Sequence, residues 1–529
     1  MKRQVSLILC IALMLTMVSC GDQGRPSPKD PVTLTLWHSY VEDMRYAFDE
    51  LVNEFNRTAG AENGVIVKVT SVADASIVSE LLLAAVDRDP GALELPDMAV
   101  VYPMTAVTLA EKGVLVDFGE YFSADELDSY VPQFMEEARL GGDSLYLMPV
   151  AVSTEVLYLN RTLFDRFSKE TGVGLDSLST FEGIAKAAAR YYEWTDAQAP
   201  DTVGSGKMFF YPEGLFSQAM IGFQQMGSDV VRDKRLNVRD PGYKRIWDFY
   251  YDSAVRGGMA IYDGWGNYLA ATGDIVCATA PSAGATYYPS RVTYMDNTKE
   301  DVEFDVLPYP VFEGGESVVS QRGGGVCVFE GGPAKGHAAS LFLRWFTEAE
   351  RNLEFCASAG YMPVRKAAFD RIMEGGYPAI ENPVAEKSLL ATAEMQKSYR
   401  FYFPPVFDGF EALQTQYADR LRQAAQDGRD NYLRMLREGR ISPGPGNGPA
   451  MPAPAPEEQE PEPDQGEWLS DMLEKVDEPA QPGQGDEPAQ PGQEPVPAAE
   501  EQGQYPDPGP MLEAWSADAM EYFIRSFDP

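Results

Sequence analysis

The chain has 529 residues, of which 81 are acidic and 43 are Lys or Arg, giving a formal net charge of −38. A chain of this length is expected to form more than one domain, or one two-lobed body with extensions. Such an acidic excess repels phosphate backbones, which argues against a nucleic-acid partner. With two histidines and no C-x-x-C pair, the sequence predicts no zinc site. We expect no other metal and no cofactor.

Residues 1–19 have the pattern of an export signal. Two basic residues precede an apolar core that is too short and too early to span a membrane in the mature protein. The run M-V-S-C at 17–20 resembles a bacterial lipobox, which implies cleavage before Cys20 and lipid on its thiol. The alternative is an ordinary signal with an incidental cysteine. Residues 20–30 would be the lipidated cysteine and a tether, so acyl chains would anchor the chain to the membrane.

The first part of the chain alternates between β-strand and helix patterns, which predicts a parallel sheet. The predicted strands cover 32–40, 65–69 and 95–102, and the predicted helices cover 43–55, 77–86 and 107–112. In open α/β sheets ligands bind at the carboxyl ends of the strands. The candidate ligand-binding residues there are Trp37, His38 and Ser39 at the end of the first strand, and Tyr102 at the end of the third. Burial of these aromatic residues in the core is the alternative.

A long extended run follows at residues 141–160 and is long enough to cross from one lobe to another. Its candidate ligand-binding residues are Ser153, Thr154 and Glu155. Further strands are predicted at 274–284, 302–310 and 321–329. The predicted helices of this part cover 176–192, 240–255, 335–357, 384–399 and 410–439.

Five cysteines occur, and three of them lie in apolar surroundings beyond the signal region, namely Cys277, Cys327 and Cys356. Buried free thiols are expected there, although an exported protein could also pair two of them.

From residue 441 onward Pro, Glu and Gln dominate, and D-E-P-A-Q-P-G-Q occurs twice. Such a composition cannot bury enough apolar surface to fold, so residues 441–510 are predicted to be an acidic disordered linker. Residues 511–529 carry a helical apolar pattern and are predicted to form a short amphipathic helix. The pattern does not say whether that helix docks on the body, on a partner or on nothing.

Signatures of catalysis are weak. The run G-S-G-K-M at 204–208 lacks the first glycine and the metal-binding hydroxyl of a phosphate-binding loop, and no G-x-S-x-G motif occurs. We therefore expect no catalytic residue and no enzyme activity. An exported glycosidase stays open as an alternative because 81 acidic residues could supply a carboxylate pair. A scaffold or adhesin that works through its tail is a third hypothesis.

Several short motifs, in this order, resemble the extracellular solute-binding proteins of bacterial ABC importers, specifically the sugar and glycerol-phosphate class. The resemblance covers about residues 31–440. The motifs that carry it are T-L-W-H-S-Y, L-P-D-M-A-V-V-Y, M-P-V-A-V-S-T-E-V-L-Y-L-N, C-A-T-A-P-S-A-G, D-V-L-P-Y-P, R-G-G-G-V-C-V-F and S-A-G-Y-M-P-V-R-K-A-A-F.

The resemblance implies an α/β fold of the type II-like periplasmic-binding-protein kind. In that fold two lobes meet at a hinge of crossing segments, and the ligand lies in the cleft between them. It places the first lobe at 31–150 plus 303–333 and the second at 151–302 plus 334–440. The hinge is expected near residues 150–154, 302–307 and 331–338.

The matching positions that face the ligand in glycerol-phosphate binders are Trp37, His38, Ser153, Ser282, Gly324 and Tyr361. Gly323 and Arg400 complete the expected ligand-binding set. The strand ending Val101-Tyr102-Pro103 departs from those binders, and Arg400 is shifted from their phosphate-holding arginine. Both departures favour an uncharged sugar over a phosphate.

The function implied is that of a lipid-anchored monomer on the cell membrane, facing the periplasm or the exterior. It would deliver a sugar-like solute, or alternatively a glycerol phosphate, to ABC permease subunits.

Overall fold

The computed structural model describes residues 24–441, except the single positions 141, 200, 203, 358, 406 and 408, together with residues 508–527. The predicted signal peptide, Cys20 and nearly all of the predicted linker therefore lie outside the described residues. No helix within the described part is long and apolar enough to cross a membrane.

One nine-stranded sheet runs through the body, in the order β2-β1-β3-β12-β4-β8-β5, with β11 paired to β4 and β13 paired to β12. Its strands are β1 (Val32–His38), β2 (Val65–Ser71), β3 (Met98–Val101), β4 (Met148–Asn160), β5 (Phe210–Pro212), β8 (Cys277–Pro281), β11 (Phe304–Leu307), β12 (Val318–Val328) and β13 (Arg400–Tyr402). Two small hairpins are β6 (Val231–Arg232) with β7 (Arg235–Leu236), and β9 (Arg291–Thr293) with β10 (Lys299–Asp301). The mixed α/β class predicted from the sequence is confirmed.

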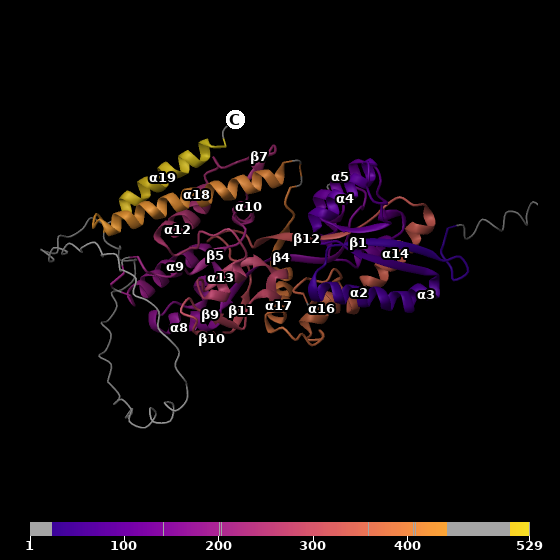
Figure 1. The fold of residues 1–529 in the computed structure, drawn as a ribbon, viewed down its shortest axis with the longest axis horizontal. Coiled ribbons are helices and arrows are strands. Elements are labelled where there is room, and N and C mark those ends of the chain that lie inside the picture. Colours follow the sequence, from indigo (N-terminus) through magenta and orange to yellow (C-terminus); the bar gives the residue numbers. More distant parts are fainter. Residues whose placement is uncertain are drawn as a thin grey trace, which may run out of the picture.

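Helices cover both faces of the sheet, and Figure 1 shows α4 and α5 on one side of β1 with α2 on the other. The helices of the first part are α2 (Glu42–Arg57), α3 (Ala59–Asn63), α4 (Ala75–Asp87), α5 (Pro103–Glu111), η1 (Phe118–Glu120), α6 (Ala124–Asp128) and α7 (Pro132–Ala138). Those of the middle part are α8 (Arg161–Thr171), η2 (Leu175–Ser179), α9 (Phe181–Asp196), α10 (Leu215–Gln225), α11 (Tyr243–Trp247), η3 (Asp248–Asp252, one turn of π-helix), α12 (Ser253–Arg256), α13 (Gly266–Thr272) and η4 (Ser282–Tyr287). The last are α14 (Pro333–Phe346), α15 (Ala349–Ala357), α16 (Lys366–Met373), α17 (Pro383–Ser398), α18 (Phe410–Arg437) and α19 (Gly509–Arg525).

Two long strands, β4 and β12, connect the halves of the sheet, and they pair with each other over Gln321–Val326 and Thr154–Met148. At one end β12 pairs with β3, and at the other end β4 pairs with β8. We call the half that contains β1, β2 and β3 the first lobe and the half that contains β5 and β8 the second lobe. Because only two paired strands join the lobes within the sheet, this crossing is a natural hinge.

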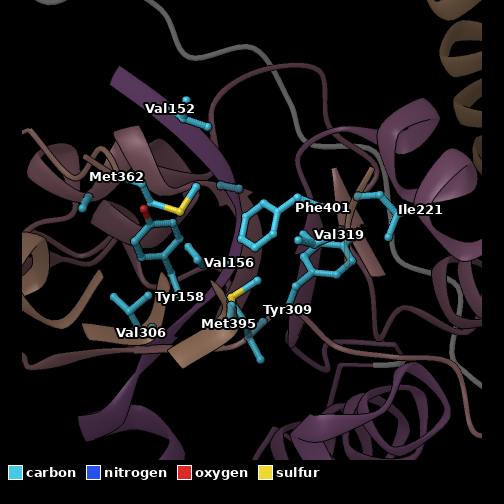
Figure 2. Close-up of a cluster of buried hydrophobic side chains, with 14 of the residues drawn as sticks. Val152, Val156, Tyr158, Ile221, Val306, Tyr309, Val319, Met362, Met395 and Phe401 are labelled. Carbon is cyan, nitrogen blue, oxygen red and sulfur yellow. The ribbon is translucent and has the colours of Figure 1, made fainter. Parts of the chain in front are cut away.

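Buried side chains continue through the crossing. Figure 2 shows part of this core, in which Val156 and Tyr158 of β4 share a cluster with Met362, Met395 and Phe401. The core therefore holds the base of the two lobes together.

Several segments, among them β11 and α14, lie in the other lobe from the one expected. The first, β11, was expected in the first lobe but pairs with β4 over Leu157–Asn160 in the second lobe. There the Asp305 carboxylate accepts a hydrogen bond from Lys387 Nζ at 2.6 Å. The second, α14, was expected in the second lobe but packs on α2 of the first, because Phe342 meets the Phe55 ring edge-on at 5.1 Å. Of the three expected hinge segments, residues 150–154 lie in β4 at the crossing. The other strand of the crossing is β12, which was not expected there in place of residues 302–307 or 331–338.

Helix α19 packs on α18 and η3 of the second lobe (Figure 1). Its buried residues are Leu512, Ser516, Phe523 and Ile524. The amphipathic helix expected at 511–529 thus runs over Gly509–Arg525 and docks on the body.

Candidate ligand-binding cleft

A cavity opens between the lobes where β4 and β12 cross, and together with the open solvent at its mouth it encloses about 900 Å³. The first lobe contributes its wall from the carboxyl ends of β1 and β3 and from the starts of α2, α4 and α5. The second lobe contributes η4, which follows the carboxyl end of β8. The lining residues include Ser39, Tyr40, Met44, Tyr102, Ala151, Ala283, Thr286, Tyr287, Gly323, Gly324 and Tyr361.

Five of the residues predicted from the sequence line this cavity, and they are Ser39, Tyr102, Gly323, Gly324 and Tyr361. Tyr102 caps the start of α5 and is 54 % exposed, so its ring stands in the opening. Tyr287 of η4 is similarly exposed on the opposite wall. The two walls therefore present aromatic faces to the cleft.

The glycines form the floor because a side chain would not fit there. A Cβ on Gly324 would lie 2.6 Å from the Val101 carbonyl oxygen. Gly323 has φ +125°, a conformation that L side chains rarely adopt, and its Cβ would lie 3.0 Å from the Ala151 carbonyl oxygen. The crossing strands can thus approach closely and leave backbone at the cavity floor.

Ser153, Thr154 and Ser282 lie just behind the wall and are buried. Ser153 Oγ is 3.1 Å from Ser282 Oγ and accepts the Ala283 N–H at 3.3 Å. Thr154 Oγ1 donates to the Ser320 carbonyl at 2.8 Å. These bonds tie β4 to η4 and to β12, so the three side chains position the hinge and the second-lobe wall.

Trp37 and His38 lie beneath the first-lobe wall. The strand alternates its side chains, so Trp37 points into the core between β1 and the α4–α5 face, with Val78 and Leu82. His38 is fully buried against Phe48, and its Nδ1 accepts the Tyr40 N–H at 3.2 Å. Burial lowers the pKa of His38 to about 4, so the ring is neutral at pH 7 and shapes the turn that brings Tyr40 to the cavity.

Arg400 lies outside the cleft. It begins β13, which pairs with the start of β12 in the second lobe, and its guanidinium donates to Gln224 Oε1 at 3.1 Å. The position carried over from glycerol-phosphate binders therefore does not bring this guanidinium to the cavity.

A charged cluster lies beside the cavity on the second-lobe side. Glu155, expected from the sequence, is buried and accepts Arg322 Nη1 at 2.5 Å, while the Arg322 side chain is 42 % exposed. Burial alone would lower the pKa of Arg322, but the charges of Glu155 and then of Glu213 raise it, and the Tyr102 hydroxyl also acts on it. Arg322 is thus paired directly with Glu155 and is also influenced by the charges of Glu213 and Tyr102.

Sequence reasoning missed Arg322, Glu213 and Trp265. Glu213 follows β5, and its Oε2 accepts the Gly266 N–H at 2.7 Å next to the exposed ring of Trp265. Burial raises the pKa of Glu213 to about 7, the Gly266 N–H opposes this, and the charge of Glu155 adds to it. The only sequence signal was placement, since Glu213 follows a strand and Arg322 and Trp265 stand next to glycines.

Within the part of the chain that the structure describes, no group of three or more His, Cys, Asp and Glu could hold a metal ion. Cys277, Cys327 and Cys356 are buried and free, as expected.

Comparisons with known proteins agree with this geometry. A profile of the family described as "Bacterial extracellular solute-binding protein" matches residues 50–382. The sn-glycerol-3-phosphate-binding periplasmic protein UgpB of Rhizobium meliloti is 22 % identical over 404 residues, covering 72 % of this chain and 88 % of that protein.

Two solved structures share the fold at a TM-score of 0.58 and 19 % identity, each over 77 % of this chain. They are the cyclic α-maltosyl-1,6-maltose binding protein from Arthrobacter globiformis, covered to 97 %, and UgpB from Mycobacterium tuberculosis in complex with glycerophosphocholine, covered to 98 %. The two-lobed fold expected from the sequence is thus confirmed, and the chain belongs to the family of bacterial extracellular solute-binding proteins.

Proposed function

We propose that this protein is the substrate-binding receptor of an ABC importer, which captures a carbohydrate or sugar-like solute between its lobes and hands it to the permease. The observation that carries the proposal is the cavity lined by both lobes at the point where β4 and β12 cross. A ligand that contacts both walls stabilises the closed arrangement over the open one, which is how binding would drive closure.

The composition of the cleft supports a sugar-like ligand. Tyr102 and Tyr287 offer aromatic faces for the C–H face of a sugar ring, and Ser39 and the backbone at Gly323 and Gly324 offer hydrogen-bonding groups. The relatives named above bind a maltose derivative and glycerophosphocholine.

A glycerol-phosphate ligand is the second candidate of the same class. Similarity to the glycerol-3-phosphate-binding relative favours it, and so does the partly exposed guanidinium of Arg322 beside the cleft.

Export and anchoring belong to the proposal as well. The lipobox-like run at residues 17–20 supports attachment of acyl chains such as palmitate to Cys20, with the folded body outside the cell membrane as a monomer. Mass spectrometry of the membrane-extracted protein should find a lipid-modified N-terminal Cys20, and an unmodified N-terminus elsewhere would refute the anchor.

The proposal is tested by a thermal-shift screen of the full chain, purified in nonionic detergent, against sugars, sugar alcohols and glycerol phosphates. A ligand at 100 times its Kd should add about 2.7 kcal/mol to the free energy of unfolding. Small-angle X-ray scattering should then show a smaller radius of gyration with the ligand than without it.

Chromatography of the incubated ligand separates receptor from glycosidase. A receptor returns the ligand unchanged, whereas steady product formation that is lost in Glu155→Ala would overturn the proposal.

A further inference from the structure

Helix α7 belongs to the first lobe but contacts the second-lobe end of the crossing strands. The carbonyl of its last residue, Ala138, accepts the Leu147 N–H at 3.2 Å, just before β4 begins in the first lobe. From the same helix, Gln133 Oε1 accepts the Phe401 N–H of β13 at 2.6 Å. Strand β13 pairs with β12 over residues 318–320, beyond the part of β12 that pairs with β4. Helix α7 therefore bridges the two lobes beside the hinge.

A buried carboxyl of α7 meets an amide of the hinge strand. Glu137 lies one helical turn after Gln133, so the two side chains share a face of α7. Gln321 is the first residue of β12 that pairs with β4, opposite Thr154. Glu137 is 6 % exposed and Gln321 is 2 % exposed, and Gln321 Nε2 donates to Glu137 Oε2. Gln321 Oε1 is also buried, and none of the described residues donates a hydrogen bond to it.

A proton on Glu137 would satisfy that oxygen. A protonated carboxyl has one O–H donor and keeps its acceptor oxygen, and an amide has both a donor and an acceptor. Glu137 can then accept from Gln321 Nε2 and donate to Gln321 Oε1, which gives two hydrogen bonds between the same two groups. An ionised carboxylate has only acceptors, so it would leave a buried Oε1 without a donor next to a negative charge.

The surroundings of Glu137 also favour the neutral acid. Burial raises the pKa of Glu137 to about 8, the Gln321 hydrogen bond opposes this shift, and no neighbouring charge contributes to it. The charged side chains of the elements that pack against α7 are exposed or bonded to other groups. They are Glu136 and Arg139 of α7 and its end, Glu155 of β4, Arg322 of β12, Arg400 of β13, and Lys366, Asp370 and Arg371 of α16.

The remaining titratable groups of these strands are uncharged. Burial raises the pKa values of Tyr158 in β4, Cys327 in β12 and Tyr402 in β13. Around neutral pH, therefore, the Glu137 proton is the one whose loss would place a charge at the contact between α7 and β12.

We propose that Glu137 is a positioning residue of the hinge, whose carboxyl proton completes a two-bond pair with the Gln321 amide and so holds the first lobe in one orientation to the second. Loss of the proton removes one bond and leaves a buried charge, so water enters between α7 and β12 and the lobes sample further orientations. The inference goes beyond the proposed function because it concerns the hinge and not the solute, so its failure leaves the receptor function standing.

Single-molecule fluorescence energy transfer on the full chain in nonionic detergent tests this proposal without a ligand. Azidophenylalanine placed at the positions of Tyr46 in the first lobe and Met295 in the second carries the two dyes, since these side chains are 61 % and 95 % exposed. Between about pH 6.5 and about pH 9.5, molecules outside the main population of the wild type should increase about fivefold or more, which is the effect of one lost hydrogen bond.

Two neighbouring glutamates provide the variant and its control. Glu137→Gln offers the donor and the acceptor of the protonated acid at every pH, so its distribution should match that of the wild type at the lower pH and should not change as the pH rises. Glu136→Gln removes the adjacent, exposed carboxylate of α7 and should respond to pH as the wild type does. Glu213, whose pKa burial raises to about 7, titrates in all three proteins and cancels in the comparison.

Infrared difference spectroscopy detects the proton itself. The carbonyl band of a buried protonated carboxyl should disappear between the lower and the higher pH in the wild type and in Glu136→Gln. The part of this band that belongs to Glu137 should be absent from Glu137→Gln, and thermal melting checks that each variant is folded.

Either measurement can overturn the inference. A wild-type distribution that does not change with pH contradicts it, and so does an equal change in a folded Glu137→Gln. A wild type without the carboxyl band at the lower pH also contradicts it. The wild-type results decide the matter even if the variant does not fold.

Discussion

Docking of α19 should be abolished by a single substitution at Phe523. This side chain is 2 % exposed and lies within an aromatic cluster on the second lobe. Its ring centroid is 5.3 Å from that of Trp247, 5.5 Å from that of Tyr417 and 6.0 Å from that of Tyr243. Trp247 Nε1 also donates to the buried Ser516 Oγ of α19 at 3.1 Å.

The magnitude follows from the burial. Leu512, Phe523 and Ile524 together contribute roughly 6 kcal/mol at about 2 kcal/mol per buried side chain. A Phe→Ala change in a core costs about 3 to 5 kcal/mol, which is half or more of that contribution. Phe523→Ala should therefore release the helix without unfolding the body.

Hydrogen exchange with mass spectrometry measures this directly. Peptides from residues 509–525 should lose protection in Phe523→Ala, while peptides from β4 and β12 should keep theirs. Tyr522→Ala is the matched control. The Tyr522 side chain is next to Phe523 in the chain but is 77 % exposed, so its removal should leave the protection of α19 unchanged. Equal protection of α19 in Phe523→Ala and wild type would refute the reasoning, and so would a simultaneous loss of protection in β4.

Other outcomes follow from single buried groups. Burial raises the pKa of Glu137 to about 8 from an ordinary 4.5, so the folded state holds a proton that the unfolded chain releases, and stability should fall as pH rises through that window. Urea unfolding between about pH 5 and 8 should show a steeper fall in wild type than in Glu137→Gln, and equal slopes would contradict this. Gly324→Ala brings Cβ within 2.6 Å of the Val101 carbonyl, so calorimetry should find a loss of about 1 to 3 kcal/mol, and an unchanged Tm would speak against the close approach. The buried thiols of Cys277, Cys327 and Cys356 should resist a bulky maleimide until urea unfolds the chain, because burial raises their pKa values. Labelling of any of these three cysteines in the folded protein would disprove their burial.

The first-lobe wall could be predicted from the sequence because parallel strands carry their following loops to one edge. That rule alone places Ser39 and Tyr102 at the cavity. It does not say to which face a strand residue points, and Trp37 is buried because helices cover both faces of β1. A periodic pattern predicts the element, but the layers on either side decide which of its residues a ligand can reach.

The lobe boundaries depend on contacts between distant residues. The strand signal at 321–329 was visible, yet the crossing of β12 requires knowing that Gln321 pairs with Thr154. Likewise α14 was visible as a helix, but only the contact between Phe342 and Phe55 shows which lobe it covers. The apolar face of α19 was predicted and its docking site was not, since Tyr243, Trp247 and Tyr417 are far from it in sequence.

The same limit applies to ligand chemistry. From the sequence, the choice between sugar and phosphate depended on where one arginine fell, and Arg400 was shifted. In the structure Arg400 lies outside the cleft, and the Arg322 guanidinium, next in the chain to Gly323 of the cavity floor, is paired with Glu155. The Glu155 carboxylate offsets the charge that Arg322 could otherwise offer to an anion. An arginine near a cleft therefore predicts an anion site only when its carboxylate partners are known, and the sequence does not show that Arg322 of β12 pairs with Glu155 of β4.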